Sequence, residues 1–219
     1  MTNASPNPSL LQAIISFNAI LGIDGRHFGA VNGDYEGVSD DNKGVQWNIR
    51  CEKASGIVEL GVNLEGMTYS YWPIAVFIEN EMKYARLLEL APTLAGTEDI
   101  SVAFYRDAWQ FASRPRIEEE FISGTPVKLN HFTEAGWMAT LAEAYTCLDA
   151  SRGRRGRGTQ TVTLRTRGKR EMDVSPHLHI STPVWMTTPC TSEQARRKIE
   201  AGFRLLQPIY AIVKSQSTQ

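Results

Sequence analysis

Arginine and lysine side chains, which can bind phosphate, are concentrated in one short stretch of the sequence. This basic segment, residues 152–170, contains Arg152, Arg154, Arg155, Arg157, Arg165, Arg167, Lys169 and Arg170, and no acidic residue. These eight are taken from 23 basic residues in all, so 15 remain against 24 acidic residues elsewhere. Guanidinium groups bind phosphate oxygens through paired hydrogen bonds, and neighbouring glycines allow close approach to a phosphate backbone. The basic segment on an otherwise acidic chain predicts contact with nucleic acid, either DNA or RNA.

Two other interpretations of the basic segment stay open. It could be a solvated loop, or it could dock on the acidic surface of a protein partner. In the second case the protein is an interaction module, for instance an inhibitor or an assembly factor. The sequence has no P-loop, no dinucleotide-binding glycine pattern, no Gly-x-Ser-x-Gly elbow and no HExxH motif, which favours a non-enzymatic role.

His177 and His179 form the second candidate site. They are two residues apart in a predicted strand, so both imidazoles would share one face and could hold a metal or act as an acid and base pair. His131 is a candidate third group. His131-Phe-Thr133 and His179-Ile-Ser181 share the form His-x-Thr/Ser, which resembles the paired motifs of the 2H phosphoesterases. That resemblance implies a histidine on each side of a phosphate, and a small histidine-based phosphoesterase as an alternative function.

Glu52 and Glu59 form the third candidate site, on the polar face of a predicted hairpin. The order helix, loop, hairpin, helix is similar to the opening of a restriction-endonuclease-like core, where clustered carboxylates hold Mg²⁺ for attack on phosphodiesters. This similarity implies a nuclease with Glu52 and Glu59 as catalytic residues and Mg²⁺ as cofactor. The lysine that this family carries two positions after an acidic residue is missing from these strands. Alternatively, Arg50 and Glu59 form only a cross-strand ion pair worth under about 1 kcal/mol.

The hairpin has the clearest periodicity in the chain. Apolar and polar residues alternate along residues 45–52 and again along 58–65, which is typical of strands with one buried face. With residues 53–56 as a four-residue turn, the predicted register pairs Glu52 with Ile57, Arg50 with Glu59, Ile49 with Leu60 and Trp47 with Val62.

Weaker patterns define the other elements. Helices are predicted over residues 9–21, 73–90, about 133–148, and from about Thr191, where Gln194 completes a capping box. Strands are predicted over residues 100–111, 127–132, 159–167 and 174–183. The last two would form a hairpin, so the basic segment lies on an Arg-rich hairpin and loop at about 151–183. Residues 22–44 are rich in glycine, aspartate and asparagine and predict a long loop, with at most a short strand near 28–31.

These elements predict a single α+β domain over residues 1–219, with an antiparallel or mixed sheet and N-terminal, central and C-terminal helices. The sequence has no run of about 18 apolar residues and no secretory signal at its start, so we expect a cytoplasmic protein without membrane contact. Cys51, Cys147 and Cys190 form no CxxC pair, so packed thiols are expected.

The leading hypothesis from the sequence is a nucleic-acid-binding protein that grips phosphate with the basic segment, and that is a nuclease if it is an enzyme. Catalysis would then use His177 and His179 with His131, or Glu52 and Glu59 with Mg²⁺. A homodimer would suit a protein that binds duplexes. Enzyme and non-enzyme alternatives both stay open at this stage.

Overall fold

The computed structural model describes residues 7–29, 35–42, 45–64, 81–94, 99–107, 127–131, 160–164 and 170–214. Its helices are α1 (Pro8–Leu21), α3 (Glu81–Leu90) and α5 (Ser192–Lys214), with short 3₁₀ turns η1 (Ala91–Thr93) and η3 (Leu129–His131). Its strands are β1 (Arg26–Phe28), β2 (Tyr35–Ser39), β3 (Val45–Glu52), β4 (Val58–Leu64), β5 (Ser101–Asp107), β6 (Val127–Lys128), β7 (Gln160–Leu164) and β8 (Arg170–Pro183).

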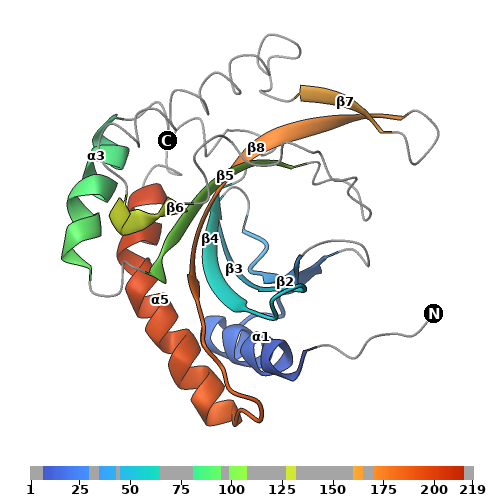
Figure 1. Cartoon of the computed structure of the whole chain (residues 1–219), viewed down its shortest axis with the longest axis vertical. Coiled ribbons are helices and arrows are strands. Elements are labelled where there is room, and N and C mark those ends of the chain that lie inside the picture. The colour runs from blue at the N-terminus through green and yellow to red at the C-terminus, as the bar shows by residue number, and fades with distance from the viewer. Residues whose placement is uncertain are drawn as a thin grey trace.

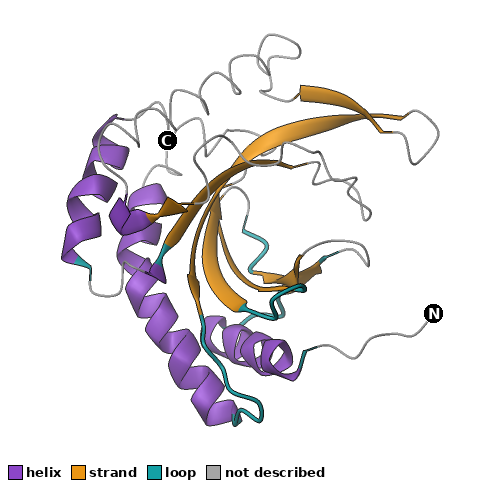
Figure 2. Ribbon diagram, viewed as in Figure 1, coloured by secondary structure: helices purple, strands orange, loops and turns teal. Residues whose placement is uncertain are grey.

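All described strand pairs are antiparallel and belong to one eight-stranded sheet. The order is β1-β2-β3-β4-β8-β5-β6, and β7 pairs with β8 outside this path. Figure 1 shows a curved sheet with α1 and α5 on its convex side, and Figure 2 shows the same separation of helices from strands. The predicted α+β class is confirmed.

The hairpin β3–β4 has the predicted register. Arg50 pairs with Glu59, Ile49 with Leu60 and Trp47 with Val62. The turn closes as expected, because the Glu52 amide donates to the Ile57 carbonyl at 3.0 Å and the Gly56 amide donates to the Glu52 carbonyl at 2.8 Å. Gly56 has a φ of +70°, a conformation that glycine adopts without strain.

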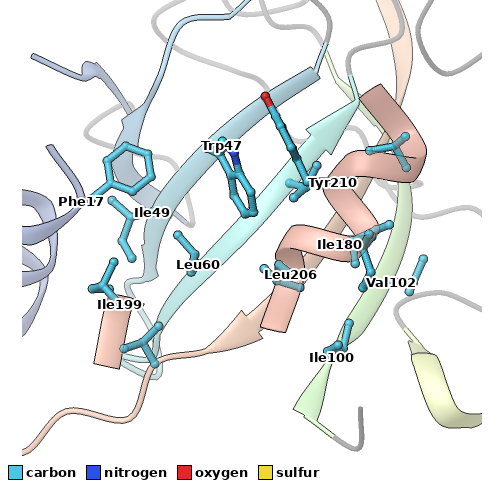
Figure 3. Packing of buried hydrophobic residues seen from close by; sticks show 14 of the residues in the cluster. Phe17, Trp47, Ile49, Leu60, Ile100, Val102, Ile180, Ile199, Leu206 and Tyr210 are labelled. Atoms are coloured by element: carbon cyan, nitrogen blue, oxygen red, sulfur yellow. The ribbon is translucent and has the colours of Figure 1, made fainter. Parts of the chain in front are cut away.

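The core lies between the convex face of the sheet and the two long helices. Figure 3 shows Trp47 beside Tyr210, and their rings stack with centroids 4.5 Å apart. Phe203 makes an edge contact with Trp47, with ring centroids 4.8 Å apart, and stacks on Phe17, with centroids 5.8 Å apart. One aromatic cluster therefore joins α1, β3 and α5, and each buried ring contributes to holding the helices on the sheet.

Local signals set both ends of α1 and the start of α5. The Asn7 side chain accepts from the Ser9 amide at 2.9 Å, Pro8 is the first residue of α1, and Gly22 caps its end in the left-handed conformation. At α5 the predicted capping box is present, because the Thr191 amide donates to the Gln194 side chain and the Gln194 amide donates to Thr191 Oγ1.

The prediction of a long loop over residues 22–44 is wrong. Strands β1 and β2 lie within this range and extend the sheet beyond β3. Glycine and aspartate weaken strand propensity, but the exposed edge of β3 offers backbone partners that outweigh this local preference. Gly37 pairs with Arg50 so closely that a side chain would not fit there.

The shorter predictions are partly confirmed. The predicted strand over 127–132 is a two-residue strand followed by a 3₁₀ turn, and α3 covers the last part of the helix predicted over 73–90. Strands β7 and β8 pair as a hairpin, as predicted, but β7 ends at Leu164 and pairs with residues 170–174, which precede most of the strand predicted over 174–183. The helix predicted over about 133–148 lies outside the described residues. No helix among the described residues is long and apolar enough to cross a membrane.

Candidate functional site

The face of the sheet opposite the helices carries a cluster of polar side chains, which we call the polar face. Residues opposite one another in an antiparallel pair share a face, and successive residues alternate. Because Trp47 packs against α5, Asn48 belongs to the other face, and the register links Asn48 through Gly61 to Ser181. The polar face includes Ser39, Asn48, Arg50, Glu59, Asn63, His179 and Ser181. Each of these side chains is buried or half-buried.

His179 is the most buried titratable residue of the polar face. It is 2% exposed, and Nε2 of its imidazole lies 3.1 Å from Oδ1 of Asn48 on β3. Asn48 is itself buried. The contact therefore gives each side chain a hydrogen-bond partner in place of the water that it loses on burial. Strands β3 and β8, which lie on either side of β4, are thus bridged by one polar contact above β4.

Gly61 makes this bridge sterically feasible. A Cβ atom at residue 61 would overlap Nε2 of His179, and would lie 2.7 Å from Cε1 of the same ring and 3.1 Å from Asn48 Oδ1. Glycine inside a strand often marks such a close approach. The gap left by the missing side chain on β4 is where the imidazole and the amide meet.

We expect Gly61→Ala to lower the free energy of unfolding by about 1–3 kcal/mol, because the added methyl group overpacks the contact between His179 and Asn48. Urea denaturation of the single variants and of Gly61→Ala combined with His179→Ala measures the coupling. Since removing the imidazole relieves the clash, the double variant should be more stable than additivity predicts by about 1 kcal/mol. If the losses in stability of the two single variants simply add up in the double variant, the residue 61 methyl group does not clash with His179.

A second polar contact lies farther along the same face. Arg50 donates from Nε and Nη2 to Glu59 Oε2, both at 2.9 Å, and Ser181 Oγ lies 3.5 Å from the same oxygen. The ring of Tyr35 covers the Arg50 guanidinium at 4.2 Å from the ring centroid. The ion pair is about four-fifths buried on each side. Glu59 therefore forms the cross-strand ion pair with Arg50 that the sequence indicated as the alternative to a catalytic role.

Glu52 has a different local role. Its carboxylate accepts a hydrogen bond from Ser55 Oγ at 2.6 Å, within the turn of the β3–β4 hairpin. Glu52 and Glu59 are thus each bonded to a structural neighbour. Among the described residues, no group of three or more histidine, cysteine, aspartate or glutamate side chains lies close enough to hold a metal ion.

The backbone separates His131 from His177, whereas His177 and His179 lie two residues apart on β8. On β8, His177 pairs with Tyr105 and His179 with Ala103 of β5. His131 ends η3, which begins where the Leu129 amide donates to the Ile100 carbonyl at 2.8 Å. The stretch from residue 100 to residue 105 spans on the order of 16 Å, so His131 follows the end of β5 that is remote from His177.

Cys51 fits the expectation of a packed thiol. It lies on the helix-covered side of β3 and is buried. Burial, and secondarily the nearby Glu36 carboxylate, raises the pKa of the Cys51 thiol, so little thiolate forms at neutral pH. Cys190 is also a free thiol and is half-buried, whereas Cys147 lies outside the described residues.

Most of the basic segment lies outside the described residues, so only its position along the chain is defined. Arg152, Arg154, Arg155 and Arg157 precede β7, and Arg165, Arg167 and Lys169 belong to the five residues that join β7 to β8. Arg170 is the first residue of β8 and pairs with Leu164. The basic residues therefore flank both ends of β7 along the chain.

Sequence reasoning missed the role of Asn48 and Gly61 in seating His179. A signal for Gly61 was present, because a glycine in the middle of an otherwise regular strand often indicates a close approach by another group. Asn48 carried no comparable signal, since a polar residue at that position is what strand alternation predicts. No protein-family model, curated protein or solved structure matches this chain.

Proposed function

We propose that this protein binds nucleic acid, and that it does so through the basic segment carried by strands β7 and β8. The observation that carries the proposal is the concentration of eight basic residues and no acidic one between Arg152 and Arg170. The rest of the chain holds 24 acidic and 15 basic residues, so attraction to phosphate is concentrated in this segment. A directed charge of this kind orients a polyanion toward one part of the protein.

The shape of β8 supports this proposal. Residues 178–183 of β8 pair with β4, and residues 175–181 pair with β5. Its first five residues, 170–174, pair with β7 alone among the described strands. Figure 1 shows β7 and the start of β8 extending away from α1 and α5. Residues 165–169, which join these two strands in the sequence, include three of the eight basic residues, Arg165, Arg167 and Lys169.

The proposal concerns binding rather than cleavage. Glu59 is paired with Arg50, Glu52 with Ser55, and His179 with Asn48. Each of these interactions has a structural purpose in the sheet or its turn. Cleavage by His177 and His179, or by Glu52 and Glu59 with Mg²⁺, remains a hypothesis that a Mg²⁺-dependent nuclease assay on the same oligonucleotides tests directly.

We expect Arg165→Ala combined with Arg167→Ala to weaken binding to nucleic acid by at least about ten-fold at low salt. Removing one interaction between an arginine and a phosphate should also reduce the slope of log K against log salt by about 0.9 for duplex DNA, so removing two should reduce it by about 2. Fluorescence anisotropy with labelled oligonucleotides over a salt series measures both quantities.

A matched control is Arg196→Ala combined with Arg197→Ala. These arginines lie exposed on α5, where each forms an ion pair with a glutamate four residues away, Glu200 and Glu193 respectively. The control removes the same charge from another surface and should leave binding nearly unchanged. Equal effects of the two double variants would disprove a directed site. If the wild-type protein binds no nucleic acid at low salt, docking on an acidic protein partner becomes the better explanation of the basic segment.

A further inference from the structure

Helix α1 has two unlike sides, and both are apolar. Its inner side packs into the core, where Leu10 and Phe17 are almost fully buried. Leu11 and Ile15 lie on its outer side and are 46% and 50% exposed. Ala19, one turn further along the outer side, is also exposed. These three outer residues are four positions apart, so they form one continuous ridge along the helix, which we call the α1 ridge.

The α1 ridge differs from the rest of the described surface. Three large apolar side chains are exposed among the described residues, Leu11, Ile15 and Trp185. A single exposed apolar side chain is ordinary, but Leu11 and Ile15 lie one turn apart and form a patch. Helix α1 has no charged residue, whereas α5 exposes Arg196 and Arg197, each paired with a glutamate. The outer side of α5 is therefore suited to water, and the α1 ridge is suited to contact with another apolar surface.

Helix α1 is held in a fixed orientation that turns the ridge away from the core. Figure 1 shows the sheet on one side of α1 and α5 on another. Ser9 Oγ lies 3.2 Å from Thr188 Oγ1, and Ser192 donates from Oγ to Gln12 Oε1 at 3.1 Å. These contacts tie α1 to the start of α5 and to the segment before it. An interface on the α1 ridge would therefore form without rearrangement of the fold, which lowers the free-energy cost of binding.

We infer that the α1 ridge binds the α1 ridge of a second copy of this chain, so that two copies form a symmetric dimer with antiparallel α1 helices. In a two-fold symmetric interface, residues near the axis meet their own copies, so a charged residue there would face a like charge. No residue of α1 is charged. Ridges of residues four apart also pack into the grooves of a like helix in the commonest class of helix packing. The inference does not depend on the proposed function.

The charge at the ends of α1 favours the same partner. A helix has a partial positive charge at its start and a partial negative charge at its end. Helix α1 has no acidic residue in its first turn and no basic residue in its last turn that would offset these charges. In an antiparallel pair, the start of each helix lies toward the end of the other, so opposite partial charges approach. A second copy therefore complements both the ridge and the ends of α1.

The size of the α1 ridge sets the expected strength of the dimer. A stable interface usually has about 20–30 residues on each side, and one face of a 14-residue helix supplies far fewer. We therefore expect a dissociation constant on the order of 10–100 µM, so that the dimer dissociates on dilution.

Sedimentation velocity of the full chain, from about 1 to 300 µM, tests this inference. The wild-type protein should change from a monomer to a species of twice its mass as the concentration rises. Ile15→Ala, which leaves a good helix former at an exposed position, should weaken association by at least about ten-fold, because each copy loses apolar contact area. Ile15→Glu and Ile15→Lys should each stay monomeric, because like charges would meet near the axis.

An equimolar mixture of the Ile15→Glu and Ile15→Lys variants should associate again, because opposite charges then face each other. Trp185→Glu is the matched control, since it places the same charge at an exposed apolar residue outside α1 and should leave the dimer unchanged. Recovery in the mixture would also show that both variants are folded.

Three results would overturn the inference. The first is a wild-type protein that stays monomeric at every concentration; flotation with phosphatidylcholine vesicles that is lost in Ile15→Glu would then assign the ridge to a lipid surface. The second is a dimer that all three Ile15 variants form as well as the wild type, which would place the interface elsewhere. The third is a mixture that stays monomeric although both variants have the wild-type circular dichroism spectrum, which would show that residue 15 does not lie near a two-fold axis.

Discussion

Replacing Trp47 by alanine is expected to lower the free energy of unfolding by about 3–5 kcal/mol, the largest loss we predict for a single substitution. Trp47 is 4% exposed, and its ring lies between Tyr210, stacked at an interplanar angle of 22°, and Phe203, in an edge contact at 67°. Truncation would open a large cavity between β3 and α5. Both surrounding rings belong to α5, so they can close the cavity only if the whole helix moves toward β3.

Urea denaturation followed by circular dichroism measures this loss, and Trp185→Ala is the matched control. Trp185 is 58% exposed, so the same change in residue type should alter the free energy of unfolding by no more than about 0.5 kcal/mol. A Trp47→Ala variant as stable as the Trp185→Ala variant would show that α5 is not held on the sheet by this aromatic cluster.

Replacing Gly37 by alanine is expected to cost about 3 kcal/mol, at the upper end of the usual range for overpacking. A Cβ atom at residue 37 would overlap the carbonyl oxygen of Ile49 and lie 2.8 Å from Cα of Arg50. Both are backbone atoms of β3, and they cannot move without breaking the pairing of β3 with β4. The strain should therefore be relieved by separation of β2 from β3.

Two measurements check this second prediction. Urea denaturation should give the loss in stability, and amide hydrogen exchange should show faster exchange for residues 35–39 than for residues 58–64. Gly22→Ala serves as the control, because a Cβ atom there meets nothing within 4 Å and the cost of its φ of +66° is about 1–2 kcal/mol. Unchanged exchange over β2 in the Gly37→Ala variant would refute the close approach of the two strands.

The sequence by itself determined the elements whose causes are local. The β3–β4 hairpin follows from period-two alternation, and one register satisfies both faces, so Arg50 opposite Glu59 was predictable. Both ends of α1 and the start of α5 follow from caps made by residues within a few positions of each helix end, such as Thr191 with Gln194. The basic segment is likewise a property of composition, although the predicted strand over 159–167 includes Arg165 and Arg167, whereas β7 ends at Leu164.

Only the tertiary structure decided the rest, because the causes lie far apart in the chain. Residues 35–39 have weak strand propensity and form β2 because the edge of β3 supplies their hydrogen bonds. The insertion of β8 between β4 and β5 depends on the shared hydrophobic core and not on any local signal. That insertion brings His179 over Gly61 to Asn48, which is 131 residues away in sequence. The sequence predicted the pairing of β7 with β8, but only the structure shows that residues 170–174 of β8 pair with β7 alone among the described strands.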